Sequence, residues 1–454
     1  MGNSAQIETM ATLVAAEAPA AADQDSRQRG AAEDVAERAG ARDYLLGTYK
    51  RAPMRLARGE GVRLYDDAGR AYLDFASGIA VNALGYDDPG LRAAIEGALD
   101  TGLVHVSNLF RTAPGERLAA ALVAHSFAAR AFFCNSGAEA NEGAFKFARR
   151  WARTLAPAGG GEAPGPFGDC AKHEIVALRG AFHGRTLGVL AATDRAAYRA
   201  PFQPLAGGVR IAERDLAELD AAVTDERTAA VIVEPVQGEG GVRVLDPGFL
   251  RELRALTAAR RVALVFDEIQ CGLGRLGTLF AYETAGVVPD MVTLAKPLAG
   301  GLPMGAVLVS AEVAAAVQPG DHGTTFGGGP LVAAAAEYVF GRVSDPALLA
   351  HVRAAGAFMA QALGALAERT GRVRAVRGAG LMWGVDTHEP AAAVVERARD
   401  AGLLVLTAGE HTLRLLPPLV TTEAELAEGL AVLEAAVAAG APAPTAAAAT
   451  GGMQ

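Results

Sequence analysis

The chain has 454 residues, 51% of them hydrophobic and 20% charged, so it holds enough apolar material for several average-sized cores. Its 42 Lys and Arg stand against 51 Asp and Glu, a formal charge of −9, which argues against nucleic acid or an anionic membrane as the main partner. There is no uncharged run of about 18 apolar residues, and the three cysteines have neither disulfide-framework numbers nor metal-ligand spacing. We therefore expect a soluble, multi-domain cytoplasmic protein with no membrane partner and no bound metal.

Both ends of the chain differ in composition from the middle. Residues 1–41 are rich in Ala, Glu, Asp and Arg and lack the basic lead and apolar core of a signal peptide, so we expect a disordered or weakly helical extension. The tail 440–454 is mostly Ala, Pro and Gly, and we expect it to be flexible. The Gly- and Pro-dense stretch 156–168 predicts a surface loop.

Between these segments, short apolar runs alternate with helical patterns. Five runs have the length and composition of strands: Ala131–Cys134, Glu174–Leu178, Ala230–Val233, Val262–Phe266 and Met291–Leu294. Helical patterns at Ala138–Arg153 and Pro247–Arg260 follow two of the runs. This alternation predicts an α/β fold with a mostly parallel sheet covered on both faces, in which ligands bind beyond the carboxyl ends of the strands.

The first three strand ends carry residues suited to an anionic, flat ligand. Ser136 and Gly137 open a helix, where free N–H groups suit a phosphate, although an ordinary serine N-cap has the same pattern. The motif GAFHGRT follows the second strand: Phe182 could stack on a ring and Arg185 could bind a carboxylate, whereas His183 is more typical of packing. The motif EPVQGEGG follows the third strand.

An acid and a lysine follow the next two strands. Asp267 begins the motif DEIQ, and Lys296 comes two residues after the fifth predicted strand. Among the other lysines, Lys146 lies in a helical pattern and Lys172 precedes a strand, so we expect both to be solvated. Only Lys296 combines a strand end with an apolar approach and a Gly-rich exit, where burial would lower the pKa of the amine and make it nucleophilic.

The glycine pattern GLGRLG at 272–277 fits the dinucleotide-binding fingerprint, but its context does not. Residues 267–271 separate it from the preceding strand, no clear helix opens from it, and no acid follows at the expected spacing. We therefore do not expect a nucleotide-binding fold.

Taken together, the motifs resemble those of the class III pyridoxal-phosphate aminotransferases, in the expected order from about Tyr49 to Val420. The motifs are SGAEANE, FHGRT, EPVQGEGG, DEIQ, LAKPLAGGLPMGA, HGTTFGG and LRLLPPL. The resemblance implies an α/β protein of fold type I, with a large mostly parallel-sheet domain and a smaller α+β domain. It places the large domain at 96–334 and builds the small one from residues 42–95 and 335–439.

The resemblance assigns catalytic and ring-binding residues for the cofactor pyridoxal 5'-phosphate. Lys296 would form the Schiff base with the cofactor and transfer the proton during catalysis. Asp267 would keep the pyridine nitrogen protonated, so that the ring accepts electrons. Gln270 would bind the ring hydroxyl, and Phe182 would stack on the ring.

The same resemblance implies a phosphate site shared between two subunits. The backbone amides of Gly137 and Ala138 would bind the cofactor phosphate, and Thr325 would reach the phosphate of the neighbouring subunit. Thr324 would lie near that subunit's substrate. The active sites would then be complete only in a homodimer.

Two arginines would let one pocket serve two small-molecule substrates. Arg414 would bind the α-carboxylate of glutamate or 2-oxoglutarate. Arg185 would bind the distal carboxylate of these molecules and the α-carboxylate of the amino donor, since guanidinium groups bind carboxylates at two points. Glu239 would pair with Arg414 when the substrate presents no carboxylate there, and would swing aside for glutamate.

Within the class, the chain most resembles the enzymes that act on N-acetylornithine. Ornithine enzymes typically carry a tyrosine at the position of Ile79, and an aliphatic residue there favours an acylated substrate; Tyr49 remains available to line the pocket. The implied reaction transfers the ω-amino group of N-acetylornithine to 2-oxoglutarate, giving N-acetylglutamate semialdehyde and glutamate, in arginine biosynthesis. Succinylornithine, succinyldiaminopimelate, ornithine and 4-aminobutyrate are alternative donors. A pyridoxal-phosphate aminomutase, a decarboxylase and a cofactor-binding protein without turnover are alternative functions.

Overall fold

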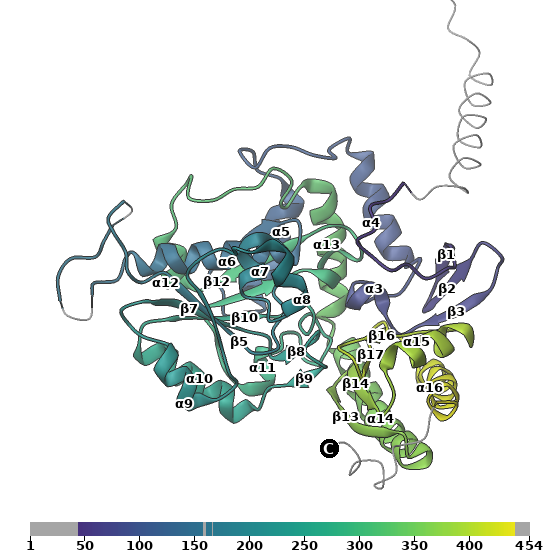
Figure 1. The fold of residues 1–454 in the computed structure, drawn as a ribbon. Helices are drawn as coiled ribbons and strands as arrows, with labels where there is room; N and C mark the ends of the chain where they lie inside the picture. The colour runs from purple at the N-terminus through teal and green to yellow at the C-terminus, as the bar shows by residue number, and fades with distance from the viewer. Residues whose placement is uncertain (1–43, 158–159, 166, 441–454) are drawn as a thin grey trace, which may run out of the picture. The chain divides into compact units, whose positions relative to one another are not determined.

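The computed structural model describes residues 44–157, 160–165 and 167–440 (Figure 1). Residues 44–54 contain no helix or strand and belong to a unit separate from the one that begins at Arg55, which carries every element named below. The predicted extension 1–41 and the predicted tail beyond residue 440 lie outside the described residues. The described residues of the predicted loop 156–168 form no helix or strand.

A seven-stranded sheet forms the centre of the large α/β part. Its strands, in spatial order, are β4 (Arg130–Cys134), β12 (Gly305–Val309), β11 (Met291–Leu294), β10 (Ala263–Asp267), β7 (Thr228–Val233), β5 (Glu174–Leu178) and β6 (Val209–Ala212). Neighbouring strands from β11 to β6 pair in parallel, and β12 pairs antiparallel with both of its neighbours. The prediction of a mostly parallel sheet is confirmed, and β6 and β12 add two strands to the five predicted.

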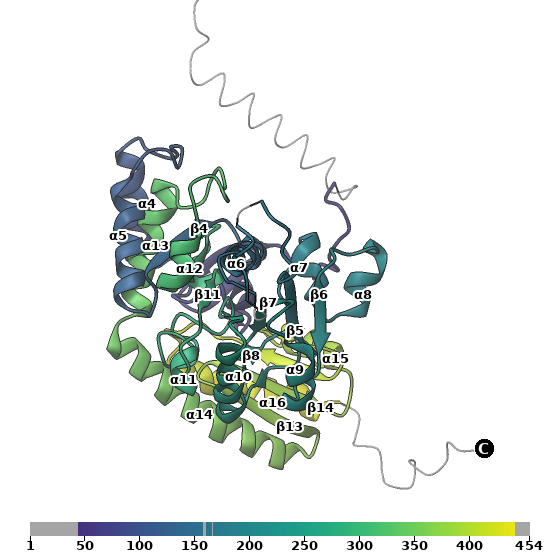
Figure 2. The same cartoon turned by 90° about the vertical axis from the view of Figure 1, so that its left-hand side faces the viewer.

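Successive residues of the buried strands point to opposite faces of this sheet, so each strand contributes to two cores. In β10, Leu264 and Phe266 pack in a core shared with α5, α9, α10 and α13, whereas Ala263 and Val265 pack with α6, α7 and α12. The helices around the sheet are α4 (Pro89–Asp100), α5 (Ala113–Ala124), α6 (Gly137–Ala152), α7 (Leu187–Ala191), α9 (Leu216–Ala222), α10 (Pro247–Ala259), α12 (Ala311–Ala316) and α13 (Pro330–Val343). Figure 2 shows α13 packed beside α4 and α5.

The smaller α+β part combines segments from both ends of this unit. One sheet has the order β1 (Leu56–Glu60), β2 (Arg63–Asp66), β3 (Ala71–Asp74) and β15 (Leu403–Leu404), and the other has the order β13 (Val373–Ala379), β14 (Met382–Thr387), β17 (Thr412–Leu415) and β16 (Leu406–Thr407). Helices α14 (Pro346–Thr370), α15 (Ala391–Asp400) and α16 (Glu423–Ala438) pack against these sheets and each other. Because β15 pairs with β3, early and late segments of the chain share one sheet. The predicted domain boundaries stay a prediction.

Three of the longer helices begin with the same dipeptide, Asp-Pro. The side chains of Asp88, Asp246 and Asp345 are the N-caps of α4, α10 and α14, and each accepts a hydrogen bond from a backbone amide in the first turn. Proline at the first helical position suits these starts, because that amide has no partner within a helix. Local sequence therefore fixes where these helices begin.

Several short elements lie in the connections between the longer ones. They are α3 (Ser77–Ala80), α8 (Ala196–Arg199), the 3-10 turn η1 (Ala200–Phe202), the hairpin strands β8 (Val236–Gln237) and β9 (Arg243–Val244), α11 (Tyr282–Ala285) and the 3-10 turn η2 (Lys296–Ala299). Within the described ranges, no helix is both long enough and apolar enough to cross a membrane.

The prediction that Lys172 is solvated is wrong. Its side chain is buried, and Nζ donates hydrogen bonds to Asp225 Oδ1 at 2.8 Å and to the backbone carbonyls of Asp225 and Arg260. The ion pair and the two carbonyls satisfy the buried ammonium, so this lysine joins the segments that precede β5, β7 and β10. Lys146 is exposed, as predicted.

Candidate active site

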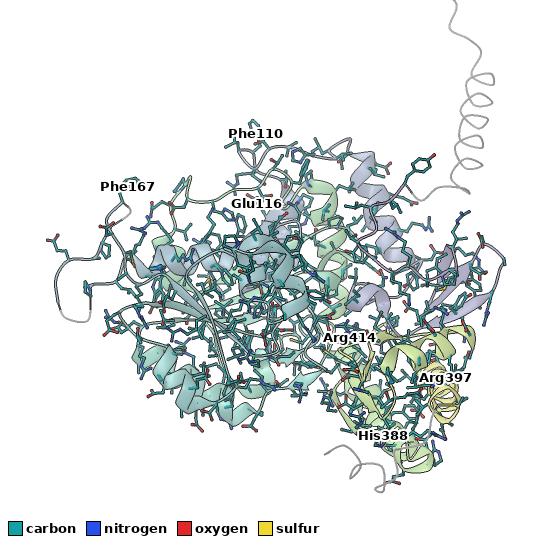
Figure 3. All side chains as sticks on the ribbon, viewed as in Figure 1. Phe110, Glu116, Phe167, His388, Arg397 and Arg414 are labelled. Carbon is teal, nitrogen blue, oxygen red and sulfur yellow. The ribbon has the colours of Figure 1, made fainter. Side chains whose placement is uncertain are left out.

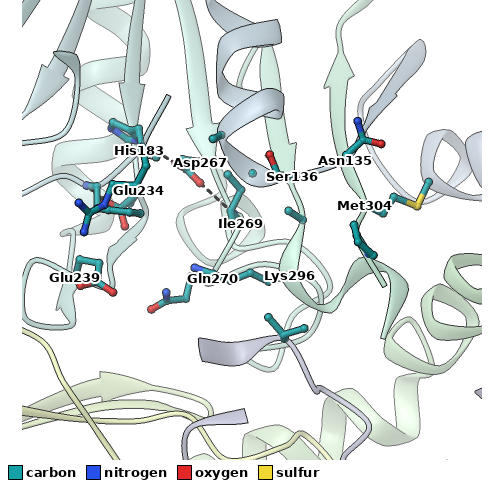
Figure 4. Close-up of a pocket in the computed structure, with 18 of the residues that line it drawn as sticks. Asn135, Ser136, His183, Glu234, Glu239, Asp267, Ile269, Gln270, Lys296 and Met304 are labelled. Carbon is teal, nitrogen blue, oxygen red and sulfur yellow. Dashed lines mark hydrogen bonds and ion pairs between the residues drawn. The ribbon is translucent and has the colours of Figure 1, made fainter. Parts of the chain in front are cut away.

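A cavity of about 410 Å³ lies at the carboxyl ends of the central strands (Figure 4). Eight of the predicted site residues line it: Gly137, Ala138, Phe182, Arg185, Glu239, Asp267, Gln270 and Lys296. These residues come from five separate strand ends, which the parallel topology brings to one edge of the sheet.

Asp267, the last residue of β10, is held by three hydrogen-bond donors and is 4% exposed. Its Oδ2 accepts from Asn141 Nδ2 and from His183 Nδ1, both at 2.8 Å, and its Oδ1 accepts from the backbone amide of Ile269 at 3.1 Å. Figure 4 shows the contacts of His183 and Ile269 with this carboxylate. The donors fix the carboxylate in one orientation, so it meets a ligand without first reorganising.

Asn141 and His183 are the partners of Asp267 that the sequence analysis does not identify. Both are buried; Asn141 also donates to the backbone carbonyl of His183 and accepts from Thr293 Oγ1 at 2.7 Å. A signal for Asn141 existed in the motif SGAEANE, because position 141 lies about one helical turn after Gly137 and faces the same strand end. His183 is buried, as expected for a packed residue, but it also donates a hydrogen bond to Asp267. The local sequence does not reveal this second role.

Lys296 begins η2 directly beyond β11, with a φ of 35° that is costly for a residue other than glycine. Because β11 pairs with β10 in parallel, Lys296 and Asp267 line the same cavity from adjacent strands. Burial lowers the pKa of the Lys296 amine from 10.5 to about 8, and the Arg414 cation is the second-largest cause of this shift. The amine therefore becomes neutral and nucleophilic closer to physiological pH than a solvated lysine does.

We expect competitive acetylation to show this pKa directly in the cofactor-free protein. The acetylation rate of Lys296, read by peptide mass spectrometry, should rise with pH because only the neutral amine reacts, and should level off above about pH 8. In the variant Arg414→Gln the midpoint should move to higher pH, since a cation that lowers the pKa is gone. A wild-type rate that keeps rising to pH 10 would contradict the lowered pKa.

The start of α6 offers an anion site. Ser136 is the N-cap, and its side chain accepts from the backbone amide of Glu139 at 3.2 Å. The amides of Gly137 and Ala138, in the first turn of this 16-residue helix, have no acceptor in the described part of the chain. A Cβ at position 137 would lie 2.8 Å from Ile269 Cδ1, so a larger residue there would have to displace the Ile269 side chain. Ser136 can therefore cap the helix while the amides of Gly137 and Ala138 stay available to an anion.

Glu234, directly after β7, joins two of the motifs. Its Oε1 accepts from the backbone amide of Phe182 at 2.8 Å, and its Oε2 accepts from that of Gly238 at 3.1 Å. Burial raises the pKa of this carboxyl to about 7. The side chain holds the FHGRT loop against the EPVQGEGG turn, and both line the cavity.

Arg414 on β17 reaches the site from the smaller part (Figure 3). It is 3% exposed; its Nη2 lies 2.7 Å from Glu239 Oε1, and its Nη1 donates to Gln270 Oε1 at 3.2 Å. Its Nε is buried without a partner among the described residues. Arg414 does not line the cavity itself, because Glu239 and Gln270 lie between. A ligand carboxylate that displaced Glu239 would meet a rigidly held guanidinium.

Arg185 stacks on an aromatic side chain. Its guanidinium carbon lies 3.3 Å from the ring centroid of Tyr198 and 5.8 Å from that of Phe182. Stacking occupies the face of the guanidinium and leaves its N–H edge for a carboxylate.

Besides Arg414, four other predicted residues do not line the cavity. Tyr49 belongs to the separate unit 44–54, and its predicted role stays a prediction. Ile79 is 40% exposed in the kinked helix α3, and Val81 lines the cavity instead. Thr324 and Thr325 lie on the loop before α13, where Thr325 is exposed. Thr324 Oγ1 accepts from Asn135 Nδ2 at 3.0 Å, and Asn135 lines the cavity.

The cavity fits a phosphorylated aromatic aldehyde such as pyridoxal phosphate. It combines free amides at a helix start (Gly137), an aromatic ring (Phe182), a fixed carboxylate (Asp267), a side-chain amide (Gln270) and an amine of lowered pKa (Lys296). The described residues contain no group of three or more His, Cys, Asp or Glu that could hold a metal ion.

The chain belongs to the class III aminotransferases, because residues 47–437 match the family model described as Aminotransferase class-III. It is 47% identical over 410 residues to the mitochondrial acetylornithine aminotransferase of Alnus glutinosa, covering 90% of this chain and 88% of that protein. A solved structure of N-acetylornithine aminotransferase from Stenotrophomonas maltophilia K279a is 40% identical with a TM-score of 0.73, covering 86% of this chain and 97% of that one. An amine transaminase from an uncultivated Pseudomonas species, solved in its PLP-bound form, is 28% identical with a TM-score of 0.79, covering 87% and 98%. The predicted family and fold class are confirmed.

Proposed function

We propose that this protein is a pyridoxal-phosphate-dependent aminotransferase that moves the ω-amino group of N-acetylornithine to 2-oxoglutarate. The products are N-acetylglutamate semialdehyde and glutamate, which places the reaction in arginine biosynthesis. The observation that carries the proposal is one cavity in which Lys296 and Asp267 meet, with Arg185 in its lining and Arg414 behind Glu239. The two relatives named for N-acetylornithine support the choice of amino donor.

Bound pyridoxal phosphate supplies an aldehyde for the amino group and a ring that withdraws electrons from the reacting carbon. The amides of Gly137 and Ala138 would bind its phosphate, Phe182 would stack on its ring and Gln270 would bind its ring hydroxyl. These contacts would orient the ligand for reaction.

Two side chains handle protons. The carboxylate of Asp267, held by His183 and Asn141, would keep a proton on the ring nitrogen of the bound cofactor. Lys296 Nζ would take the proton from the substrate carbon that bears the amino group and return it to the carbon that was the cofactor's aldehyde. A lowered pKa supports this role, because an amine with a pKa of about 8 is partly neutral at pH 7 to 8.

Two guanidinium groups distinguish the substrates. Arg185 binds the α-carboxylate of N-acetylornithine, while Glu239 stays paired with Arg414 and neutralises it. Glutamate brings a second carboxylate, which replaces Glu239 on Arg414, and its distal carboxylate takes Arg185. Both arginines thus hold a carboxylate in one half-reaction and only Arg185 in the other.

A second copy of the chain is the partner we propose, with active sites shared between subunits. Leu109, Phe110 and Phe326 are 88%, 70% and 65% exposed, and Phe110 projects outward in Figure 3. Asn108 ties the two segments together by donating to the carbonyl of Thr324, so Thr325 belongs to this apolar surface. Such a patch is typical of a protein interface. Light scattering should give twice the mass of one chain; the mass of one chain would contradict the homodimer.

A panel of amino donors with 2-oxoglutarate, read by glutamate formation, tests the substrate. We expect N-acetylornithine to have the highest kcat/KM, ahead of succinylornithine, succinyldiaminopimelate, ornithine and 4-aminobutyrate. A 4-aminobutyrate value equal to that of N-acetylornithine would overturn the substrate and leave the aminotransferase class intact.

A further inference from the structure

A second cavity, of about 450 Å³, lies against Glu239. Its lining includes Arg195, Tyr198 and Thr407, whereas none of these three lines the cavity that holds Lys296. Glu239 lines both cavities, so its side chain lies at the boundary between them. Its side chain is 22% exposed, and its carboxylate pairs with Arg414.

Arg195 is a cation placed beside Glu239. Its Nη2 donates a hydrogen bond to the backbone carbonyl of Glu239. In the described part of the chain, no carboxylate lies within ion-pair distance of its half-buried guanidinium, whereas Arg414 has Glu239. A guanidinium with spare N–H donors therefore lies next to the residue whose carboxylate has to move.

The backbone around Glu239 is held in place, so the motion is a side-chain rotation. The amide of Gly238 donates to buried Glu234 Oε2 at 3.1 Å, and Arg195 holds the carbonyl of Glu239 itself. A Cβ at Gly240 would lie 2.6 Å from the carbonyl oxygen of Gly180, which shows how closely these two turns approach. The carboxylate of Glu239 can therefore move only by rotation about its side-chain bonds.

Charge balance decides where the carboxylate goes. When glutamate places one carboxylate on Arg414 and the other on Arg185, neither arginine is left for Glu239. A carboxylate that remained there would face the substrate's like charges in a site of low dielectric. Arg195 is the cation that lines the other cavity with Glu239.

We infer that Arg195 receives the Glu239 carboxylate in the second cavity whenever a dicarboxylate substrate occupies the first, and thereby sets the affinity for glutamate and 2-oxoglutarate. This inference rests on the proposed function for the use of Arg185 and Arg414. Arg195 touches no substrate; it is a specificity-determining residue that acts through Glu239.

Single-turnover kinetics of the cofactor-loaded protein, followed by the cofactor's absorbance, test the inference in the two half-reactions. In Arg195→Gln we expect the half-saturating concentration of glutamate to rise at least about tenfold, as the loss of one charge-assisted hydrogen bond implies. The limiting rate with glutamate, and both constants with N-acetylornithine, should stay within about twofold. Arg195→Lys should retain part of the glutamate affinity, and Arg210→Gln, an exposed arginine on β6, is the matched control.

The same substitution in a Glu239→Gln background separates the inference from a structural effect. With no carboxylate to receive, Arg195→Gln should no longer change glutamate saturation. Equal losses in both half-reactions, no change in the wild-type background, or a persistent effect beside Glu239→Gln would each overturn the inference. Failure of N-acetylornithine alone would overturn the proposed donor and leave the glutamate measurement decisive, whereas no reaction with glutamate would overturn both.

Discussion

Replacing Lys296 by alanine is expected to lower the transamination rate by about 10⁴-fold while the protein stays folded. The substitution removes the amine that joins the cofactor and that moves the substrate proton, and positioned proton transfer alone contributes about 10²- to 10⁴-fold. The fold should persist, because the variant removes a cation whose burial is unfavourable, and alanine can adopt the φ of 35° at a similar cost.

Steady-state glutamate formation and circular dichroism are the measurements for this variant. Lys146→Ala is the matched control, since Lys146 is exposed on α6 and does not line the cavity; it should keep near-wild-type activity. Added methylamine should restore part of the lost rate, because a free amine can take over the proton transfer. A folded Lys296→Ala protein with a tenth of the wild-type rate would show that another group does the chemistry.

Asp267→Asn should cost about 10²- to 10³-fold in kcat, a loss typical of removing one preorganised electrostatic group. Asparagine has nearly the same shape and can still accept a hydrogen bond from Asn141 or His183, so the cavity should keep its form. What it lacks is the negative charge that holds a proton on the ring nitrogen. The loss should therefore fall on kcat more than on cofactor affinity.

Glu268→Gln is the matched control for Asp267→Asn. Glu268 is the next residue and is also buried, and burial raises the pKa of its carboxyl to about 8, but it accepts from the amides of Ala281 and Tyr282 and does not line the cavity. Glu268→Gln should lower the melting temperature and change kcat by no more than a few-fold. Equal kcat losses in the two variants would assign Asp267 a structural role only.

The sheet could be predicted where each strand has a continuous apolar run. β5 and β11 match their predicted bounds, because strands buried on both faces must be apolar throughout. β6 and β12 are short runs, VRIA and GAVLV, and sequence alone does not separate them from the Ala- and Gly-rich segments around them. The antiparallel direction of β12 depends on its pairing with β4, a contact between distant segments.

The site could be predicted as far as residues directly follow strands. Once the ends of their strands were predicted, Asp267 and Lys296 could be expected to share a site, because parallel strands bring their carboxyl ends to one edge. Asn141, the contact of His183 with Asp267, and the stacking of Tyr198 on Arg185 depend on packing between separate segments, which no local pattern encodes. The prediction that Lys172 is solvated failed for the same reason, because its partner Asp225 lies 53 residues away in the sequence.

Borohydride reduction of the cofactor-loaded protein, followed by proteolysis and mass spectrometry, tests the central proposal most directly. Reduction makes the link between cofactor and lysine permanent, so the modified residue can be read from its peptide. We expect a single modified peptide, with the cofactor on Lys296. A cofactor found on Lys50, Lys146 or Lys172, or on no lysine, would contradict the proposed active site.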